Sequence, residues 1–107
     1  MTLFRSVFGG SSEASQRIGG REAWRLVREE GAVLLDVRSP AEYASGHADG
    51  ALNIPLQDLS RRMGEVPKDR PIVVYCASGR RSASACEALS RAGRTAYDAG
   101  GLGALAR

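Results

Sequence analysis

The chain has few of the residues that build disulfide scaffolds and metal sites. Its 107 residues include two cysteines, Cys76 and Cys86, and one histidine, His47. A small secreted disulfide domain usually carries more cysteines, so we expect a reduced intracellular protein. With no second histidine and no cysteine cluster, the sequence suggests no metal site, and we expect no cofactor.

Long apolar runs and charge of one sign are also missing. The longest apolar runs, such as residues 32–35, have the length of a strand, and residues 1–8 hold an arginine within a short apolar stretch. We therefore expect no signal peptide, no membrane span and a cytoplasmic location. The net charge is +3, but basic and acidic residues alternate along the chain. That mixture predicts a solvated surface and does not favour a nucleic-acid partner.

The length allows one domain, and the composition divides the chain near residue 17. Residues 9–16 are small and polar. We expect residues 1–16 to form a flexible N-terminal segment and residues 17–107 to form the folded domain.

Strand and helix patterns alternate through the expected domain. Ser39, Pro40 and Glu42 have the spacing of a helix start with a capping box. The alternation predicts an α/β fold in which helices cover both faces of a mainly parallel sheet. The expected helices are residues 20–30, a short one from 40, 56–63 and 80–92, and the expected strands are 32–37, 51–54, 71–75 and 95–97.

Cys76 directly follows residues 71–75, the clearest strand pattern in the chain. Ligands of α/β sheets bind beyond the carboxyl ends of the strands, and the helix that follows would turn its N-terminal N–H groups toward the sulfur. Gly79 permits the tight curvature, while Arg80 and Arg81 add positive charge. These effects should lower the pKa of Cys76 from about 8.5, so that a thiolate forms without a histidine base. The same cradle would stabilise a terminal persulfide.

Over residues 17–101 the chain resembles the rhodanese-like single-domain sulfurtransferases. The resemblance rests on five segments in order: DVR at 36–38, SPAEY at 39–43, GHADGALNIP at 46–55, CASGRRS at 76–82 and the glycine pair at 100–101. The loop at 76–82 fits the family pattern C-x-x-G-x-R-S. The resemblance implies a rhodanese-like α/β fold with a central, mainly parallel five-stranded sheet flanked by helices on both faces.

The resemblance also implies a reaction and its partners. Cys76 would take the outer sulfur of thiosulfate, or of another small anionic donor, and pass it to cyanide, a thiol or a thioredoxin-like protein. The N–H groups of residues 77–81 would form the cradle, and Arg81 would hold either the loop or the anion. The expected substrate-binding residues are Ala77, Ser78, Gly79, Arg80, Arg81 and Ser82. One departure is that no tryptophan follows the glycine pair, so we expect the last helix to be short or missing.

Two other functions compete with this one. Phosphatases and arsenate reductases share the fold, but their C-x5-R loop is one residue longer than the C-x4-R spacing from Cys76 to Arg81. The second alternative is a non-catalytic rhodanese module that binds partners or carries sulfur for another pathway. Retention of Cys76 with Gly79 and Arg81 favours catalysis. The sequence does not predict an oligomeric state.

Asp36, Arg38 and Arg80 have candidate supporting roles. Asp36 ends a strand at the same edge of the sheet as Cys76, and we hypothesise that it braces the site by pairing with Arg38 or a loop arginine. A plain loop-capping carboxylate is an equal alternative. Arg80 either attracts thiosulfate at the mouth of the pocket or is simply solvated.

Three further residues are best explained by structure. Cys86 lies on the apolar face of the helix after the loop, which predicts a small buried hydrophobe. Two helical turns separate it from Cys76, so we do not expect a disulfide between them. His47 is expected to stabilise a turn through a hydrogen bond. Trp24 is expected in the core.

Overall fold

Four parallel strands form the sheet of residues 17–107, the part of the chain that the computed structural model describes. The flexible segment predicted for residues 1–16 lies outside this part. The order across the sheet is β2-β1-β3-β4, and each neighbouring pair is parallel. The predicted α/β fold with a parallel sheet is therefore confirmed. The strands are β1 (Val33–Asp36), β2 (Leu52–Asn53), β3 (Ile72–Cys76) and β4 (Ala96–Gly101).

The expected fifth strand is not formed within these residues, so the five-stranded sheet was wrong in this detail. At the outer edge of β4, Arg17 makes a single parallel bridge with Asp98, and the Ile18 N–H donates to the Asp98 carbonyl at 2.8 Å. A helix begins at Gly20, only three residues after Arg17. The pairing therefore stops after one bridge, which is too short for a strand.

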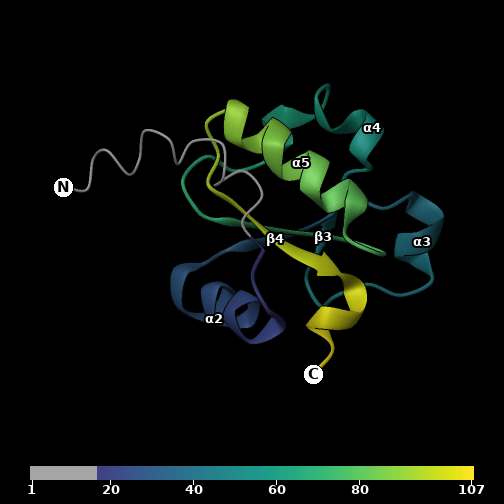
Figure 1. Ribbon diagram of the computed structural model, residues 1–107. Helices are drawn as coiled ribbons and strands as arrows, with labels where there is room; N and C mark the ends of the chain where they lie inside the picture. The colour runs from purple at the N-terminus through teal and green to yellow at the C-terminus, as the bar shows by residue number, and fades with distance from the viewer. Residues whose placement is uncertain (1–16) are drawn as a thin grey trace.

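Helices cover both faces of the sheet, as the alternation predicts. In Figure 1, α4 and α5 lie on one side of the strands and α2 on the other. None of the helices in residues 17–107 has the length and apolar character needed to cross a membrane. The helices are α2 (Gly20–Glu30), α3 (Pro40–Ala44), α4 (Leu56–Leu59) and α5 (Arg80–Arg91), with 3-10 turns η1 (Met63–Glu65) and η2 (Leu102–Leu105).

The two-residue period of β3 assigns each of its side chains to one of two cores. Val74 and Cys76 lie in the cluster that includes Leu89 of α5, while Val73 and Tyr75 lie in the cluster around α2. Successive side chains of a strand point to opposite faces. Cys76 therefore emerges on the face that α5 covers, which brings its sulfur beneath the start of that helix.

The helix start predicted at Ser39 is confirmed by both halves of a capping box. The Ser39 hydroxyl accepts from the Glu42 N–H at 3.2 Å, and Glu42 Oε1 accepts from the Ser39 N–H at 2.9 Å. Pro40 occupies the first helical position, where its missing N–H costs nothing. This short helix fixes the direction of the Glu42 side chain.

The glycine pair at the end of β4 allows the last turn to approach the Cys76 loop. Gly100 has a φ of 80°, a conformation that favours glycine. A Cβ at Gly101 would collide with the Ala77 carbonyl oxygen. The expected short last helix is the four-residue turn η2, and Trp24 is buried against it, with Nε1 donating to the Leu105 carbonyl at 3.0 Å.

Gly101→Ala should destabilise the protein by about 1–3 kcal/mol, the usual cost of forcing extra volume into a packed site. The added Cβ has to displace backbone of the Cys76 loop at Ala77. Chemical denaturation measures the change in the free energy of unfolding. Gly103→Ala is the matched control, because no heavy atom lies within 4 Å of a Cβ at that position. Equal losses in the two variants would contradict this account.

Candidate functional site

Cys76 is the last residue of the most buried strand and lies four residues before the first residue of a long helix. All five residues of β3 are buried, and Cys76 pairs in register with Gly101 of β4. Gly79 is the N-cap of α5, and its φ of 103° turns the chain sharply into the helix. The loop between strand and helix is thus only residues 77–79, so the sulfur and the helix N-terminus face each other.

Backbone N–H groups donate hydrogen bonds to the Cys76 sulfur. The Gly79 N–H donates to Sγ at 2.9 Å, and the Ser82 N–H donates at 3.4 Å. Of the loop amides expected to form the cradle, Gly79 therefore makes a direct bond, and Ser82 adds a donor from the first turn of α5. The N–H groups of Arg80 and Arg81 belong to the same turn, whose donors have no acceptor within the helix.

These hydrogen bonds shift the protonation of Cys76. Burial by itself raises the pKa of the thiol, because it penalises the charged form. Hydrogen bonds from the Ser82 side chain and N–H, and from the Gly79 and Ser78 N–H groups, outweigh burial and lower the pKa of Cys76 below its ordinary value. The site therefore favours the nucleophilic thiolate.

Cys86 has the opposite environment, although it lies in the same core cluster as Cys76. It is a free, fully buried thiol. Burial is the main cause that raises its pKa to about 12, and the charge of Asp98 adds to the shift. A thiol in this state is a core hydrophobe, as the sequence predicts, and not a nucleophile.

Arg81 ties the Cys76 loop to the start of α3. Its guanidinium makes a two-pronged ion pair with Glu42, with N–O distances of 2.8 and 3.0 Å. Of the two roles left open for Arg81, the geometry supports holding the loop. Hydrogen bonds from the Arg81 side chain and then from the Ser39 N–H lower the pKa of Glu42 to about 2.

Asp36 pairs with Arg38, the first of the two partners proposed for it. Both residues are buried, and Arg38 Nη2 lies 2.7 Å from Asp36 Oδ2, while its Nε lies 3.0 Å from Oδ1. The same Nη2 donates to the Gly46 carbonyl at 2.7 Å. The pair thus joins the end of β1 to the segment after α3. In register, Asp36 lies beside Tyr75, one residue before Cys76.

Arg80 and Asp98 differ in their exposure to solvent. The Arg80 side chain is exposed, at the surface where a small anion would approach. Asp98 is buried below and was missed by the sequence reasoning, yet its Oδ1 lies 2.7 Å from the Ser82 hydroxyl. The available signal was a lone carboxylate inside a short apolar strand, two residues before the glycine pair.

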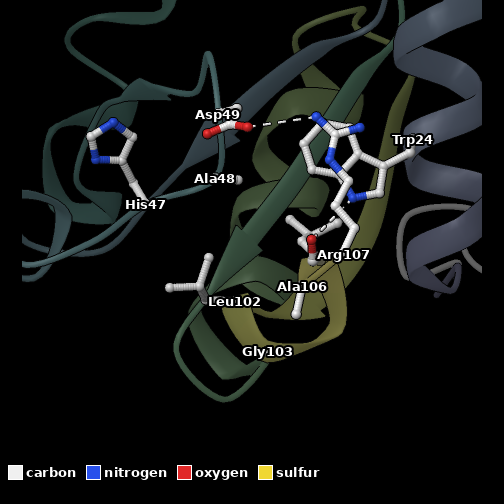
Figure 2. A pocket seen from close by; sticks show the side chains of 9 residues that line it. Trp24, His47, Ala48, Asp49, Leu102, Gly103, Ala106 and Arg107 are labelled. Atoms are coloured by element: carbon white, nitrogen blue, oxygen red, sulfur yellow. Dashed lines mark hydrogen bonds and ion pairs between the residues drawn. The ribbon is translucent and has the colours of Figure 1, made fainter.

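His47 borders a separate cleft of about 310 Å³ that none of residues 76–82 lines. Figure 2 shows the cleft, with the Arg107 guanidinium between Asp49 and Trp24. The central carbon of the Arg107 guanidinium lies 3.5 Å from the centre of the Trp24 ring. His47 Nδ1 lies 2.9 Å from the Tyr43 carbonyl, and the two rings stack at 3.7 Å. These contacts agree with the predicted turn-stabilising role. The cleft is lined by Trp24, His47, Ala48, Asp49, Leu102, Gly103, Leu105, Ala106 and Arg107.

Comparison with known proteins shows the family of the chain. A family model described as rhodanese-like domain matches residues 20–104. A protein named sulfurtransferase from Allochromatium vinosum is 45% identical over 85 residues, which are 78% of this chain and 79% of that protein. The thiosulfate sulfurtransferase PspE of Escherichia coli is 42% identical over 71 residues, 64% of this chain and 68% of that protein.

A solved structure gives the same similarity in three dimensions. The reduced CoADR-RHD protein of Bacillus anthracis superposes with a TM-score of 0.77 and 34% sequence identity. The match covers 86% of this chain but 16% of that one, so it compares this fold with one part of a much larger protein.

The thiolate of Cys76 should form at a lower pH than that of an ordinary cysteine, which titrates at about 8.5. The ultraviolet absorbance of the thiolate, measured against pH in the wild type and in Cys76→Ser, isolates the titration of Cys76. Cys86 should give no thiolate signal in the folded variant up to pH 10, because its pKa is raised to about 12. A midpoint at or above the ordinary value would refute the cradle.

Glu42→Gln should remove a stabilisation that depends on pH. Because the pKa of Glu42 is about 2 in the folded protein and near 4.5 ordinarily, its ion pair stabilises the fold fully above pH 4.5 and progressively less down to pH 2. The difference in free energy of unfolding between wild type and variant should therefore shrink over that interval. Urea denaturation at several pH values tests this, with Glu87→Gln on the exposed face of α5 as the control. A difference that does not change with pH would contradict the ion pair.

Proposed function

The chain belongs to the rhodanese-like domain family, and from this premise we propose that it is a thiosulfate sulfurtransferase that carries sulfur on Cys76. The observation that carries the proposal is the pair of N–H groups, from Gly79 and Ser82, that donate to the Cys76 sulfur. A sulfur-transfer role is supported by the relatives named sulfurtransferase. We further propose that thiosulfate is the sulfur donor and that cyanide, a thiol or a thioredoxin-like protein is the acceptor.

The first half-reaction loads the cysteine. The Cys76 thiolate attacks the outer sulfur of thiosulfate and forms a new S–S bond. The S–S bond of thiosulfate breaks, and sulfite leaves with the electron pair. The products are sulfite and a Cys76 persulfide, and the total charge is unchanged. A lowered pKa of Cys76 favours this step, because the thiolate and not the thiol is the nucleophile.

The start of α5 then supports the charge of the persulfide. Its terminal sulfur carries the negative charge that Sγ carried before, one bond further from the backbone. The N–H groups of Arg80 and Arg81 lie in the first helical turn, next to the two donors already bonded to Sγ. Helix N-termini bind anions through such free N–H groups and through the helix dipole. The negative charge can therefore move from Sγ to the terminal sulfur without a rearrangement of the loop.

The second half-reaction unloads the cysteine. An acceptor nucleophile attacks the terminal sulfur, the persulfide S–S bond breaks, and Cys76 leaves as a thiolate. With cyanide the product is thiocyanate. With a thiol or a thioredoxin-like protein the product is a new persulfide on that partner. The exposed residues Ala77 and Ser78 border the route by which an acceptor would enter.

The short loop and its charge favour a sulfur donor over a phosphate ester. The C-x4-R spacing gives a narrower cradle than the C-x5-R loop of phosphatases. The Arg81 guanidinium is already paired with Glu42, so it is not available to bind phosphate oxygens. Arg80 is exposed at the loop and would attract the divalent thiosulfate ion through a charge that salt screens.

Purified protein should transfer sulfur from thiosulfate to cyanide, and Cys76→Ser should reduce turnover to the background rate. After thiosulfate alone, intact mass should rise by one sulfur atom, and cyanide should remove it. Cys86→Ala is the matched control and should retain turnover and the mass increase, because Cys86 is a core residue.

Equal rates in wild type and Cys76→Ser would refute the enzyme and leave the non-catalytic rhodanese module. Hydrolysis of a phosphate monoester that depends on Cys76, without sulfur loading, would instead favour the phosphatase alternative.

A further inference from the structure

Asp98 is a buried carboxylate under the Cys76 loop, and the proposed reaction gives it no role. Only 1% of its surface is exposed. Its Oδ1 lies 2.7 Å from the Ser82 hydroxyl and accepts from the Gly100 N–H at 2.8 Å. Its Oδ2 lies 3.2 Å from Arg17 Nη2. A buried charge is costly unless its partners satisfy it, and here both oxygens are satisfied.

The bond between Asp98 and Ser82 fixes the first turn of α5. The Ser82 hydroxyl has one proton and three candidate acceptors, which are Asp98 Oδ1 at 2.7 Å, the Gly79 carbonyl at 3.1 Å and the Cys76 sulfur. A charged acceptor at the shorter distance takes the proton in preference to a neutral one. Ser82 is then anchored through its side chain, while its own N–H points to the Cys76 sulfur at 3.4 Å.

Arg17 balances the charge of Asp98 and also contacts the loop. Its Nη2 lies 3.5 Å from the Gly79 carbonyl, a long contact at the edge of hydrogen-bond range. A Cβ at Gly79 or at Gly100 would lie 3.0 Å from a nitrogen of this guanidinium. The absence of side chains at these two glycines therefore makes room for Arg17 between the loop and the end of β4.

We propose that Asp98 is a positioning residue for the sulfur chemistry of Cys76, acting through the Ser82 hydroxyl to aim the Ser82 N–H at the sulfur. Arg17 neutralises the buried carboxylate so that it can remain there as an anion. The bearing of this network on turnover rests on the proposed sulfurtransferase function. Its effect on the Cys76 thiolate does not, because that state exists without any substrate.

The sign of one measurement separates positioning from a plain charge effect. If Asp98 acted only through its charge, its removal would make the Cys76 thiolate easier to form, because a nearby negative charge disfavours a second one. If it aims the Ser82 N–H, its removal weakens a hydrogen bond to the thiolate and makes that state harder to form. The two mechanisms therefore shift the titration midpoint of Cys76 in opposite directions.

The test compares the thiolate absorbance of Cys76 against pH in a set of variants, each corrected by the same variant carrying Cys76→Ser. Asp98→Ala should raise the midpoint by about one pH unit, the size expected for one weakened hydrogen bond to a charged group. Asp98→Asn keeps an acceptor oxygen for the Ser82 hydroxyl and should raise the midpoint by less than half the shift of Asp98→Ala. Ser82→Ala breaks the same bond from the other side and also removes the hydroxyl beside the sulfur, so it should raise the midpoint at least as much as Asp98→Ala.

The double variant and a surface control complete the design. If Asp98 acts through Ser82, Asp98→Ala should add nothing further in a Ser82→Ala background, as a double-mutant cycle measures. Asp69→Ala, at an exposed aspartate, should leave the midpoint unchanged. A midpoint that falls or stays constant in Asp98→Ala, or full additivity in the cycle, overturns the proposal.

Two further outcomes are covered by the same set. If Asp98→Ala fails to fold, Ser82→Ala and Asp98→Asn test the proposal by themselves. The proposal then requires that Ser82→Ala raise the titration midpoint of Cys76 and that Asp98→Asn raise it by less than half as much. Any other pattern refutes it. Should the wild type fail to use thiosulfate, the proposed function fails, while the midpoints still decide whether Asp98 positions the loop.

Discussion

The contact between the Cys76 sulfur and the start of α5 is the constraint on which the rest of the site depends. A thiolate at the end of a fully buried strand has no water to solvate it, so its charge must be met by protein groups. Backbone N–H groups at the start of a helix stabilise the negative charge of the thiolate without adding a second titratable group. This requires a very short loop, and the left-handed Gly79 provides the turn. The sulfur can therefore be both buried and charged.

Three arginine–carboxylate pairs fix the segments that border this contact. One lies at the end of β1, one joins the loop to the start of α3, and one lies under the loop at β4. Such ion pairs contribute little to stability: the cost of removing charges from water offsets the attraction in the buried pair, and water screens the attraction in the two partly exposed pairs. Their value here is geometric, since each pair joins segments distant in sequence or braces a strand end. The pairs are Arg38 with Asp36, Arg81 with Glu42, and Arg17 with Asp98.

The same arrangement explains why two cysteines in one core cluster behave differently. Both side chains are buried, so burial raises the pKa of each. Cys76 lies at the amide-rich start of α5 and gains hydrogen bonds that reverse the effect. Cys86 lies within the helix, where the backbone N–H groups already bond to helical carbonyls. Position relative to the N-terminus of α5 thus explains why the pKa is lowered for one thiol and raised for the other.

Local patterns in the sequence predict most of the helices and strands and point to Cys76 as the candidate nucleophile, because such patterns act over a few neighbouring residues. The apolar run at 71–75, the glycine after Cys76 and the Ser39–Glu42 capping box act over a few residues, and each is present as predicted. The tertiary structure alone decided which carboxylate meets which arginine. Arg81 meets Glu42 across 39 positions, and Asp98 meets Ser82 across 16. It also formed a bridge between Arg17 and Asp98, which the sequence did not predict. Such partners follow from strand register and helix packing, and no local pattern carries that information.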